Sequence, residues 1–404
     1  MKLAHRRSPW MATRVLRGLA TALFVVGGLP RAASAAEGGP VGRLELADAA
    51  HDGAAIESLG TDNSRWRLAD GTRLDVPTRS VVAWGRCPPW PVGPHLLLAD
   101  GGVLAGRLES LDERTAVVRS RSLGRLELPA DAIAGFRSTA AGGPPSESAD
   151  TADTAPAPRT LRIDLHNGDR IAARSISIGA GIARIDRAGE RVEIPLDRIL
   201  GIDLRRPPSS ARPGPRILVA LEDGSRFPFE RLAARDGRMP SVAEMIVAVA
   251  VDGGCATSLA SLAPVSFAQA PTAGRPWPLA RGRTVGGDRP HARGLTGFTA
   301  LGIHAPARVR YRLERPADRF ESLVAIDDSA GQGGSVVVRV LADPGDGRFR
   351  EVFASPVLRG GDEPLAIRAD LAGAQVIELS VEPADNADIL DRTVWLDPRV
   401  VATR

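Results

Sequence analysis

Two acidic residues followed by a glycine cluster are the first feature of this sequence that could do chemistry. The segment AIDDSAGQGGSVVVRV, residues 325–340, places Asp327 and Asp328 just before three glycines. A glycine-rich turn holds phosphate only if a helix N-terminus or a basic side chain completes the site. Here the carboxylates repel phosphate, and the β-branched residues 335–340 predict a strand instead of a helix. A sugar, a cation or a tight turn capped by Asp328 remain as interpretations.

A second acidic loop, ADNADILD at residues 384–391, carries Asp385, Asp388 and Asp391 at every third position. Carboxylate oxygens are the ligands that calcium prefers, although this spacing differs from that of an EF-hand, whose ligands lie two residues apart. We therefore expect either a structural calcium, which would be the one cofactor, or a solvated polar loop.

The sequence contains no motif of a known catalytic centre. We find no G-x-S-x-G elbow, no H-E-x-x-H pair and no Walker loop. A pair of carboxylates can catalyse the hydrolysis of a glycosidic bond. Carboxylates are common in this sequence, so their presence alone does not indicate a glycoside hydrolase. We expect no catalytic residues, and a glycoside hydrolase-related enzyme is the third of our functional hypotheses.

The elements around these loops are predicted to be strands of a β-sandwich. From residue 262 to the C-terminus, apolar residues alternate with polar ones, as in RVRYRL at 308–313 and VIELSV at 376–381. Turn residues recur about every ten positions, and no amphipathic helix is evident. This pattern is typical of a two-layered antiparallel sandwich.

Four segments of this region, taken in order, resemble the NPCBM family of carbohydrate-binding modules. They are LGIH at 301–304, the AIDD loop with its strand at 325–340, SPVLRGGD at 355–362 and DRTVWLDPRVV at 391–401. The family accompanies glycoside hydrolases, notably those of family 98, and has a galactose-binding-like sandwich of the jelly-roll type. The resemblance implies a non-catalytic protein that binds galactose-type glycans weakly. A hydrolase label would come from the module's usual companion.

Five residues of the sandwich are candidates for contacts with sugar: His304, Asp327, Asp328, Arg359 and Trp395. The carboxylates can accept hydrogen bonds from hydroxyl groups, and the guanidinium can fork onto paired hydroxyls or onto Asp362. His304 can donate to a hydroxyl or lie hydrogen-bonded in the core. Trp395 can stack on a sugar ring, but its place in an alternating strand also fits burial.

One position departs from the family pattern. Arg392 stands where the family commonly has histidine. An altered or lost sugar site would leave a scaffold or protein-interaction protein of the cell envelope, which is our second hypothesis.

The first half of the chain contains a repeated β unit. Each of three copies has a proline, an aliphatic residue four positions later and a large apolar residue three beyond that. The triplets are Pro77/Val81/Trp84, Pro129/Ile133/Phe136 and Pro195/Ile199/Ile202. Asp-Gly and Asn-Gly pairs between alternating strands predict hairpins at 96–108 and 163–175. We expect small antiparallel barrel-like units that serve as a binding groove or as a platform.

These patterns divide the chain into seven parts. They are a signal peptide (1–35), repeat 1 (42–86), repeat 2 (95–137), a disordered linker (138–160), repeat 3 (161–204), a degenerate repeat 4 (215–261) and the sandwich (262–404). The linker contains no aromatic residue and is rich in Pro, Ser, Thr and Ala, a composition that does not fold by itself.

The N-terminal segment predicts export. Arginines precede the apolar run GLATALFVVGGL (18–29), and Ala33 and Ala35 match a small-x-small cleavage pattern. Twelve apolar residues are too few to span a bilayer, which needs about 20. We therefore expect a secreted or periplasmic protein cleaved near Ala35, with no membrane span and with a glycan or an envelope protein as partner.

The charge distribution argues against nucleic acid as a partner. Six of the 52 basic residues lie in the first 35 positions, and the remaining 46 face 48 acidic residues. A nearly neutral mature chain has no electrostatic attraction for a polyanion. Cys87 and Cys255 are the only cysteines, and in an exported protein they are either two free thiols or one long-range disulfide.

Overall fold

The computed structural model describes residues 39–139, 161–187, 189–204, 215–229, 244–272 and 276–403, together with the backbone of strand β1 (Phe24–Val25). The expected signal peptide, except for β1, and most of the expected linker lie outside these residues. The described residues contain strands and short 3-10 turns but no α-helix, which confirms the all-β class. Accordingly, none of them forms a helix with the length and apolarity needed to cross a bilayer.

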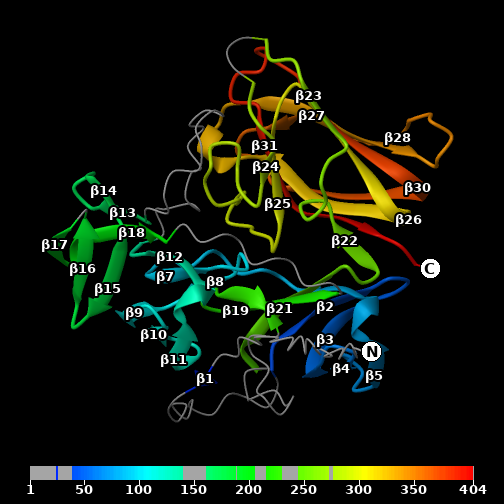
Figure 1. Ribbon diagram of the computed structural model, residues 1–404. Helices are drawn as coiled ribbons and strands as arrows, with labels where there is room; N and C mark the ends of the chain where they lie inside the picture. Colours follow the sequence, from blue (N-terminus) through cyan, green and yellow to red (C-terminus); the bar gives the residue numbers. More distant parts are fainter. Residues whose placement is uncertain are drawn as a thin grey trace, which may run out of the picture.

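The strands form three antiparallel sheets (Figure 1). The largest has fourteen strands in the order β14 (Arg170–Ala173), β13 (Leu161–Leu165), β18 (Ile199–Asp203), β12 (Ile133–Arg137), β7 (His95–Leu98), β8 (Val103–Ala105), β20 (Arg226–Pro228), β19 (Arg216–Leu221), β21 (Ile246–Asp252), β6 (Val81–Gly85), β2 (Val41–Leu46), β3 (Ala50–Leu59), β4 (Asn63–Arg67) and β5 (Arg73–Pro77). The second has the order β1, β11 (Gly124–Pro129), β10 (Thr115–Ser120), β9 (Arg107–Leu111), β15 (Ser175–Gly179), β16 (Ile182–Arg187) and β17 (Glu190–Pro195).

The third sheet belongs to the C-terminal part of the chain. Its main path is β24 (Ala280–Arg281), β25 (Ala300–His304), β31 (Arg392–Val401), β26 (Ala307–Ile326), β30 (Leu365–Pro383), β27 (Ser335–Asp343) and β28 (Arg350–Ala354). Three short strands join it: β22 (Ala256–Ser258) on β31, β23 (Ser266–Gln269) on β26 and β29 (Leu358–Arg359) on β27. We call residues 256–403 the C-terminal sandwich and the described residues from 39 to 252 the N-terminal lobe.

The proline triplets of the repeats build the same local structure three times. Each proline ends a strand and is followed by a 3-10 turn and then by another strand. The turns are η1 (Thr78–Ser80), η2 (Ala130–Ala132) and η3 (Leu196–Arg198). Proline suits this place because its fixed φ is compatible with the turn and it has no N–H to contribute to the ladder. The two apolar residues of each triplet then point into the core and are at most 4% exposed.

The predicted hairpins are confirmed as β7–β8 and β13–β14. The turn differs from the two-residue type: Gly101 and Gly168 have φ of +86° and +91°, whereas Asp100 and Asn167 are not in the left-handed region. The glycine N–H donates to the carbonyl of Leu98 or Leu165, each at 3.0 Å. Each hairpin is therefore closed by a three-residue loop with a glycine bulge. Like a two-residue turn, this loop joins two antiparallel strands.

The repeats do not close into separate barrels; among the described residues no closed barrel is present. Instead, strands of different repeats pair with one another: β12 with β18, β6 with β21, and β9 with β15. Each repeat has unpaired edges, and pairing with a neighbour satisfies their backbone groups. The N-terminal lobe therefore has one continuous core that includes Trp66 and Trp84.

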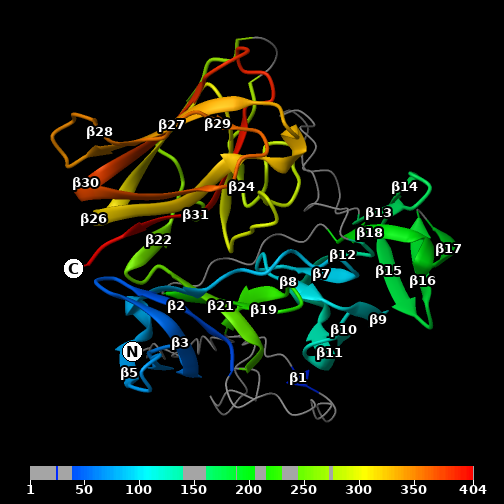
Figure 2. The same ribbon diagram turned by 180° about the vertical axis from the view of Figure 1, so that it is seen from behind.

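The C-terminal sandwich is organised by three long strands. β26 pairs with β30 along most of its length and with β31 over its second half. Alternating side chains from these strands and from β27, such as Val309, Tyr311, Leu379 and Val338, are fully buried in a separate core. The predicted sandwich is confirmed, and both views show it lying over β2, β21 and β19 of the large sheet (Figures 1 and 2).

The sandwich is joined to the N-terminal lobe by partly buried polar contacts. The Arg399 guanidinium pairs with Glu45 of the lobe at 2.6 Å and with Glu321 of the sandwich at 2.9 Å. Arg319 of the sandwich donates to the carbonyl of Leu46 at 3.1 Å. Because these partners are paired and largely covered, separating the two parts would break contacts between charged groups.

A second contact across the junction is a stack of aromatic and basic side chains. The Arg226 guanidinium lies 3.6 Å from the centre of the Trp90 ring. Its nitrogens donate to the carbonyls of Pro88 at 2.6 Å and Gly297 at 2.7 Å. Arg289 also lies over Trp90 and contacts the Nε2 of buried His95 at 2.5 Å. No local sequence pattern predicts these contacts, because their partners lie far apart in the chain.

Candidate functional site

Three loops meet at one end of the sandwich, which we call the loop end. They are residues 327–334 between β26 and β27, residues 360–364 after β29, and residues 384–391 between β30 and β31. The Gly360 N–H donates to the carbonyl of Gly334 at 3.2 Å, and the Ser335 N–H donates to Asp391 at 2.7 Å. The loop end therefore brings together six predicted site residues: Asp327, Asp328, Arg359, Asp385, Asp388 and Asp391.

The glycine cluster permits this close approach of backbones. A Cβ on Gly360 would collide with the carbonyl oxygen of Gly333, and a Cβ on Gly334 would collide with the carbonyl of Leu390. Gly331 also needs its freedom, because it ends the η6 turn (Asp328–Ala330) with φ of +61°. The glycines therefore pack loop against loop, which the sequence pattern alone did not reveal.

The two acids of the first loop have different tasks. Asp327 is 1% exposed and caps the turn, because its Oδ1 accepts the Ser329 N–H at 3.0 Å. Burial raises the pKa of Asp327. The capping role that we expected of Asp328 thus belongs to Asp327, which has no surface to offer a ligand.

Asp328 is exposed and faces the segment around residue 292. Its carboxylate accepts the Arg293 N–H at 3.0 Å and lies 3.0 Å from the Nδ1 of His291. Arg293 in turn pairs with Glu363 at 3.1 Å. This acid therefore anchors one rim of the loop end and keeps part of its surface open to solvent.

Arg359 extends from β29 at the loop end and is exposed. Its guanidinium pairs with Asp385 at 2.7 Å, and the two side chains are 56% and 50% exposed. Asp362, the partner expected as an alternative to hydroxyl groups, instead accepts the backbone N–H of Arg359 at 2.8 Å. The Arg359–Asp385 pair is an accessible set of planar donors and acceptors.

Trp395 is not available to a ligand. It is fully buried, its ring centre lies 6.2 Å from that of Phe320, and its Nε1 donates to Thr393 at 3.2 Å. The alternation of β31 points this residue into the sandwich core, so the stacking role is wrong and the alternative of burial is correct.

His304 is also largely enclosed. It is 6% exposed, its Nδ1 lies 2.6 Å from the carbonyl of Ala305, and its ring stacks on Trp277 at 5.4 Å. The Arg392 guanidinium lies 5.2 Å from the same tryptophan ring. Burial lowers the pKa of His304, so it is a neutral packing residue. Half-buried Trp277 is a candidate that our set of site residues missed, although the segment GRPWPLARG carried a signal for it.

The three acids expected to bind calcium have separate protein partners. Asp385 pairs with Arg359, Asp388 accepts the Thr272 N–H at 2.8 Å, and Asp391 accepts the Ser335 N–H. In the described part of the chain, no group of three His, Cys, Asp or Glu side chains is placed to hold a metal ion. The expectation of calcium gains no support from this geometry.

Both cysteines are free thiols. Cys87 is buried and Cys255 is half-buried. Burial raises the pKa of each thiol, which makes both weak nucleophiles at neutral pH. Of the two alternatives left open by the sequence, the structure has the free thiols.

A comparison with known protein families identifies the family of the C-terminal sandwich. Residues 259–401 match the model described as the NPCBM/NEW2 domain. The C-terminal sandwich is an NPCBM/NEW2 domain. The matched range agrees with the predicted module at 262–404, and a carbohydrate-binding module family is therefore shown for this part of the chain.

One curated relative shares part of the chain. It is the "Putative endo-alpha-N-acetylgalactosaminidase" of Renibacterium salmoninarum, 34% identical over 104 residues, which is 25% of this chain and 7% of the relative. The chain thus matches only a small fraction of that protein's length.

Two similar solved structures come from Clostridium perfringens. The CBM51 of GH95 in complex with methyl-galactose is 19% identical with a TM-score of 0.32, over 36% of this chain and 99% of that one. The CBM51-2 and INT domains of ZmpB in complex with GlcNAc are 20% identical with a TM-score of 0.32, over 42% of this chain and 35% of that one.

Proposed function

We propose that this protein is an exported, non-catalytic carbohydrate-binding protein whose NPCBM/NEW2 domain binds galactose-type glycans weakly at the loop end. The match of residues 259–401 to this domain carries the proposal.

The surface of the loop end supports this use. Arg359, Asp385 and Asp328 expose donors and acceptors there, and the packed glycines and the buried cap of Asp327 hold their backbones in place. Hydroxyl groups of a sugar both donate and accept hydrogen bonds, and bonds to a charged partner are the stronger ones. Preorganised groups also lose less entropy on binding.

The galactose class rests on two observations. The motifs at 301–304 and 325–340 resemble a galactose-binding-like family, and the matched relative is named for an N-acetylgalactosamine substrate. We therefore expect galactose and N-acetylgalactosamine to bind better than glucose.

The proposal is tested by a glycan array on the mature chain, followed by calorimetric titration with methyl galactoside, N-acetylgalactosamine and glucose. A Kd of about 1 mM corresponds to about 4 kcal/mol and is typical of weak recognition. Binding of a galactose-type sugar in this range is expected, and the absence of binding to every glycan would overturn the proposal. A protein partner whose binding persists in excess sugar would then favour the envelope scaffold.

The loop end is tested by Arg359→Ala. Loss of a charged hydrogen bond costs about 1.5–3 kcal/mol, so the affinity for the sugar should fall at least about tenfold. The matched control is Arg350→Ala, which removes an exposed arginine that is paired with Asp346 but lies near the opposite end of β27. Equal affinity of the two variants would exclude the loop end as the site.

Export and the lack of catalysis are each open to a direct test. We expect the mature protein outside the cytoplasm with Ala36 as its first residue, as read by N-terminal sequencing. We expect no hydrolysis of nitrophenyl galactosides or N-acetylgalactosaminides above background, and turnover that survives purification would contradict the non-catalytic role.

A further inference from the structure

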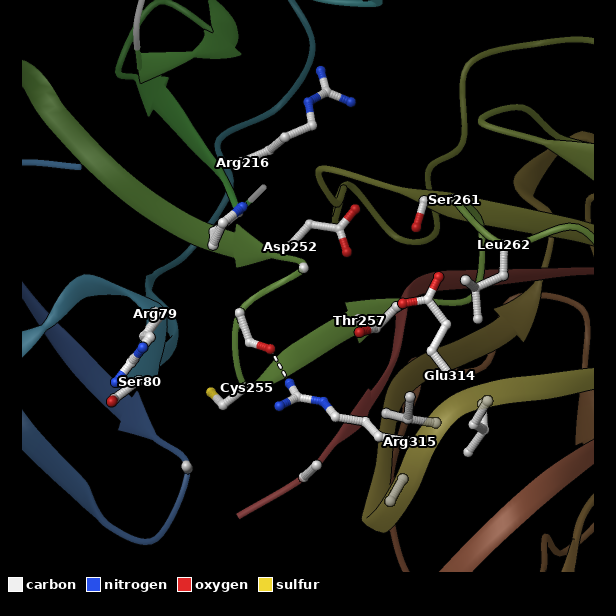
Figure 3. A pocket seen from close by; sticks show the side chains of 18 of the residues that line it. Arg79, Ser80, Arg216, Asp252, Cys255, Thr257, Ser261, Leu262, Glu314 and Arg315 are labelled. Carbon is white, nitrogen blue, oxygen red and sulfur yellow. Dashed lines mark hydrogen bonds between the residues drawn. The ribbon is translucent and has the colours of Figure 1, made fainter. Parts of the chain in front are cut away.

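A second ligand-sized space lies where the two parts of the molecule meet, away from the loop end. It is a cavity of about 830 Å³ between β22, the start of β19, the η1 turn and the middle of β26 (Figure 3). Its walls come from both the N-terminal lobe and the sandwich. Ligand sites have volumes of about 300–1,000 Å³ and often form at domain interfaces.

The walls of this junction cavity are held in place by contacts across the junction. Arg315 of the sandwich donates to the carbonyl of Gly254 in the connecting segment. The Cys255 N–H donates to the carbonyl of Arg79 at 2.7 Å, and the Ala402 N–H donates to the carbonyl of Cys255 at 2.9 Å. These contacts tie the two walls of the cavity to each other.

Polar side chains line the cavity, and apart from the contacts of Asp252 with Ser261 and Arg216 few of them satisfy one another. Asp252 and Ser261 lie on the same side as Thr257 and Glu314, and Arg79 lies across from them (Figure 3). Within the described residues, no hydrogen-bond or ion-pair partner is found for the side chains of Arg79, Thr257 or Glu314. Asp252 accepts the Ser258 N–H at 2.8 Å, and burial raises its pKa. These groups retain unused hydrogen-bonding capacity.

The charged and hydroxyl side chains that line the junction cavity indicate which class of ligand could bind there. The lining carries charges of both signs, with three arginines (79, 216 and 315) that disfavour a simple cation and two carboxylates, Asp252 and Glu314, that disfavour a phosphate. The hydroxyl group of Thr257 adds a donor and an acceptor, whereas the Ser261 hydroxyl already donates to the carbonyl of Ser258 at 2.7 Å and adds acceptor capacity. A ligand with many neutral hydroxyl groups satisfies all of them, since each hydroxyl both donates and accepts.

We propose that the junction cavity is a second saccharide-binding site, which takes a short segment of a neutral oligosaccharide between the N-terminal lobe and the sandwich. This inference rests on the proposed function for the class of ligand, but it uses different residues. Two sites on one chain would increase the avidity for a polymeric glycan that can reach both.

Cys255 provides a reporter that distinguishes the two sites. Its half-buried thiol lines the cavity, whereas Cys87 is buried elsewhere and serves as an internal reference. The alkylation of each cysteine by iodoacetamide is followed by mass spectrometry in the purified protein, at alkaline pH because both thiol pKa values are raised. The probes are lactose, chitotriose and maltotriose.

We expect at least one probe to slow the alkylation of Cys255 at least threefold without changing that of Cys87. Glu314→Gln and Thr257→Val should each weaken this protection, and Arg359→Ala should leave it unchanged. Thermal unfolding of the variants confirms that they are folded, and the protection of the wild-type chain needs no variant.

Two results overturn the inference. If a probe binds but leaves the alkylation of Cys255 unchanged, and Arg359→Ala abolishes the binding, only the loop end is a site and the proposed function stands. If neither the glycan array nor any probe shows binding, the proposed function fails together with the second site.

Discussion

The carboxyl group of Asp391 is buried at the loop end beside two other acids. Burial, with added repulsion from Asp388 and Asp385, raises the pKa of Asp391 from 3.8 to about 6. The folded state therefore prefers the neutral acid. The stability that this preference contributes is fully present below pH 3.8 and is lost as the pH rises through about 6.

Asp391→Asn should therefore stabilise the protein at neutral pH. The Asn Oδ1 can still accept the Ser335 N–H, and its amino group replaces an unfavourable charge. We expect a gain of about 2 kcal/mol at pH 7 that disappears below pH 4, as measured by urea unfolding across this range. A loss of stability at pH 7 would contradict this account and would indicate that the carboxylate holds a cation.

His95 has the opposite pH dependence. It is fully buried beside the Arg289 guanidinium, and burial lowers its pKa from 6.5 to about 4. The neutral ring accepts from Arg289 through Nε2 and donates through Nδ1 to the carbonyl of Gly93. Its contribution to stability is present above pH 6.5 and is lost as the pH falls through about 4.

We expect His95→Asn to remove this acid sensitivity. The shift in pKa corresponds to about 3 kcal/mol between pH 7 and pH 4, at about 1.4 kcal/mol per unit. The variant loses the contact with Arg289 at every pH, so the relevant readout is the slope of unfolding free energy against pH. An unchanged slope would show that His95 does not titrate in this range.

Single residues of the candidate site were predictable only in part. Asp327 and Trp395 were identified as polar and aromatic candidates, but both are buried. The types and spacing of residues in the sequence indicate which side chains have the chemistry to contact a sugar. Whether it faces solvent depends on the layer that covers it, which is encoded elsewhere in the chain.

Among the elements, the loops of the loop end depend on glycine at positions where backbones touch. A Cβ on Gly360 would lie against the backbone of residues 331–333, none of which is a flexible side-chain tip. We expect Gly360→Ala to cost about 1–3 kcal/mol of unfolding free energy and to weaken sugar binding.

The control is Gly179→Ala, where an added Cβ meets no atom within 4 Å and φ is not positive. This variant should unfold within about 0.5 kcal/mol of the wild type. If both substitutions are equally mild, the three loops do not pack as described.

Strands and hairpins whose signals lie in neighbouring residues were predicted correctly. The hairpins at β7–β8 and β13–β14 and the strands after Pro77, Pro129 and Pro195 follow from turn residues and alternation within about ten positions. The exact turn was missed, because a glycine bulge and a two-residue turn share the same residue types.

At the scale of the whole molecule, the two parts are coupled through buried Arg226. Its guanidinium stacks on Trp90 of the N-terminal lobe and donates to Gly297 of the sandwich. Arg226→Ala should cost about 3 kcal/mol or more, because the stack and the buried carbonyls lose their partner. Calorimetry should then show two unfolding transitions where the wild type shows one.

Arg170→Ala is the control for this variant, since the Arg170 side chain is 74% exposed in an ion pair on the lobe. It should leave a single transition near the wild-type temperature. Two transitions already present in the wild type would mean that the junction does not couple the two parts.

The sequence by itself determined the all-β class, the hairpins, the repeated proline turns and the identity of the C-terminal module, because each of these is encoded by residues close together in the chain. Only the tertiary structure decided that the repeats share one sheet instead of closing separately, and that Pro88 and Trp90 contact residues two hundred positions away. Those contacts depend on which surfaces remain unpaired after the local elements form, and they create the junction cavity that no local pattern contains.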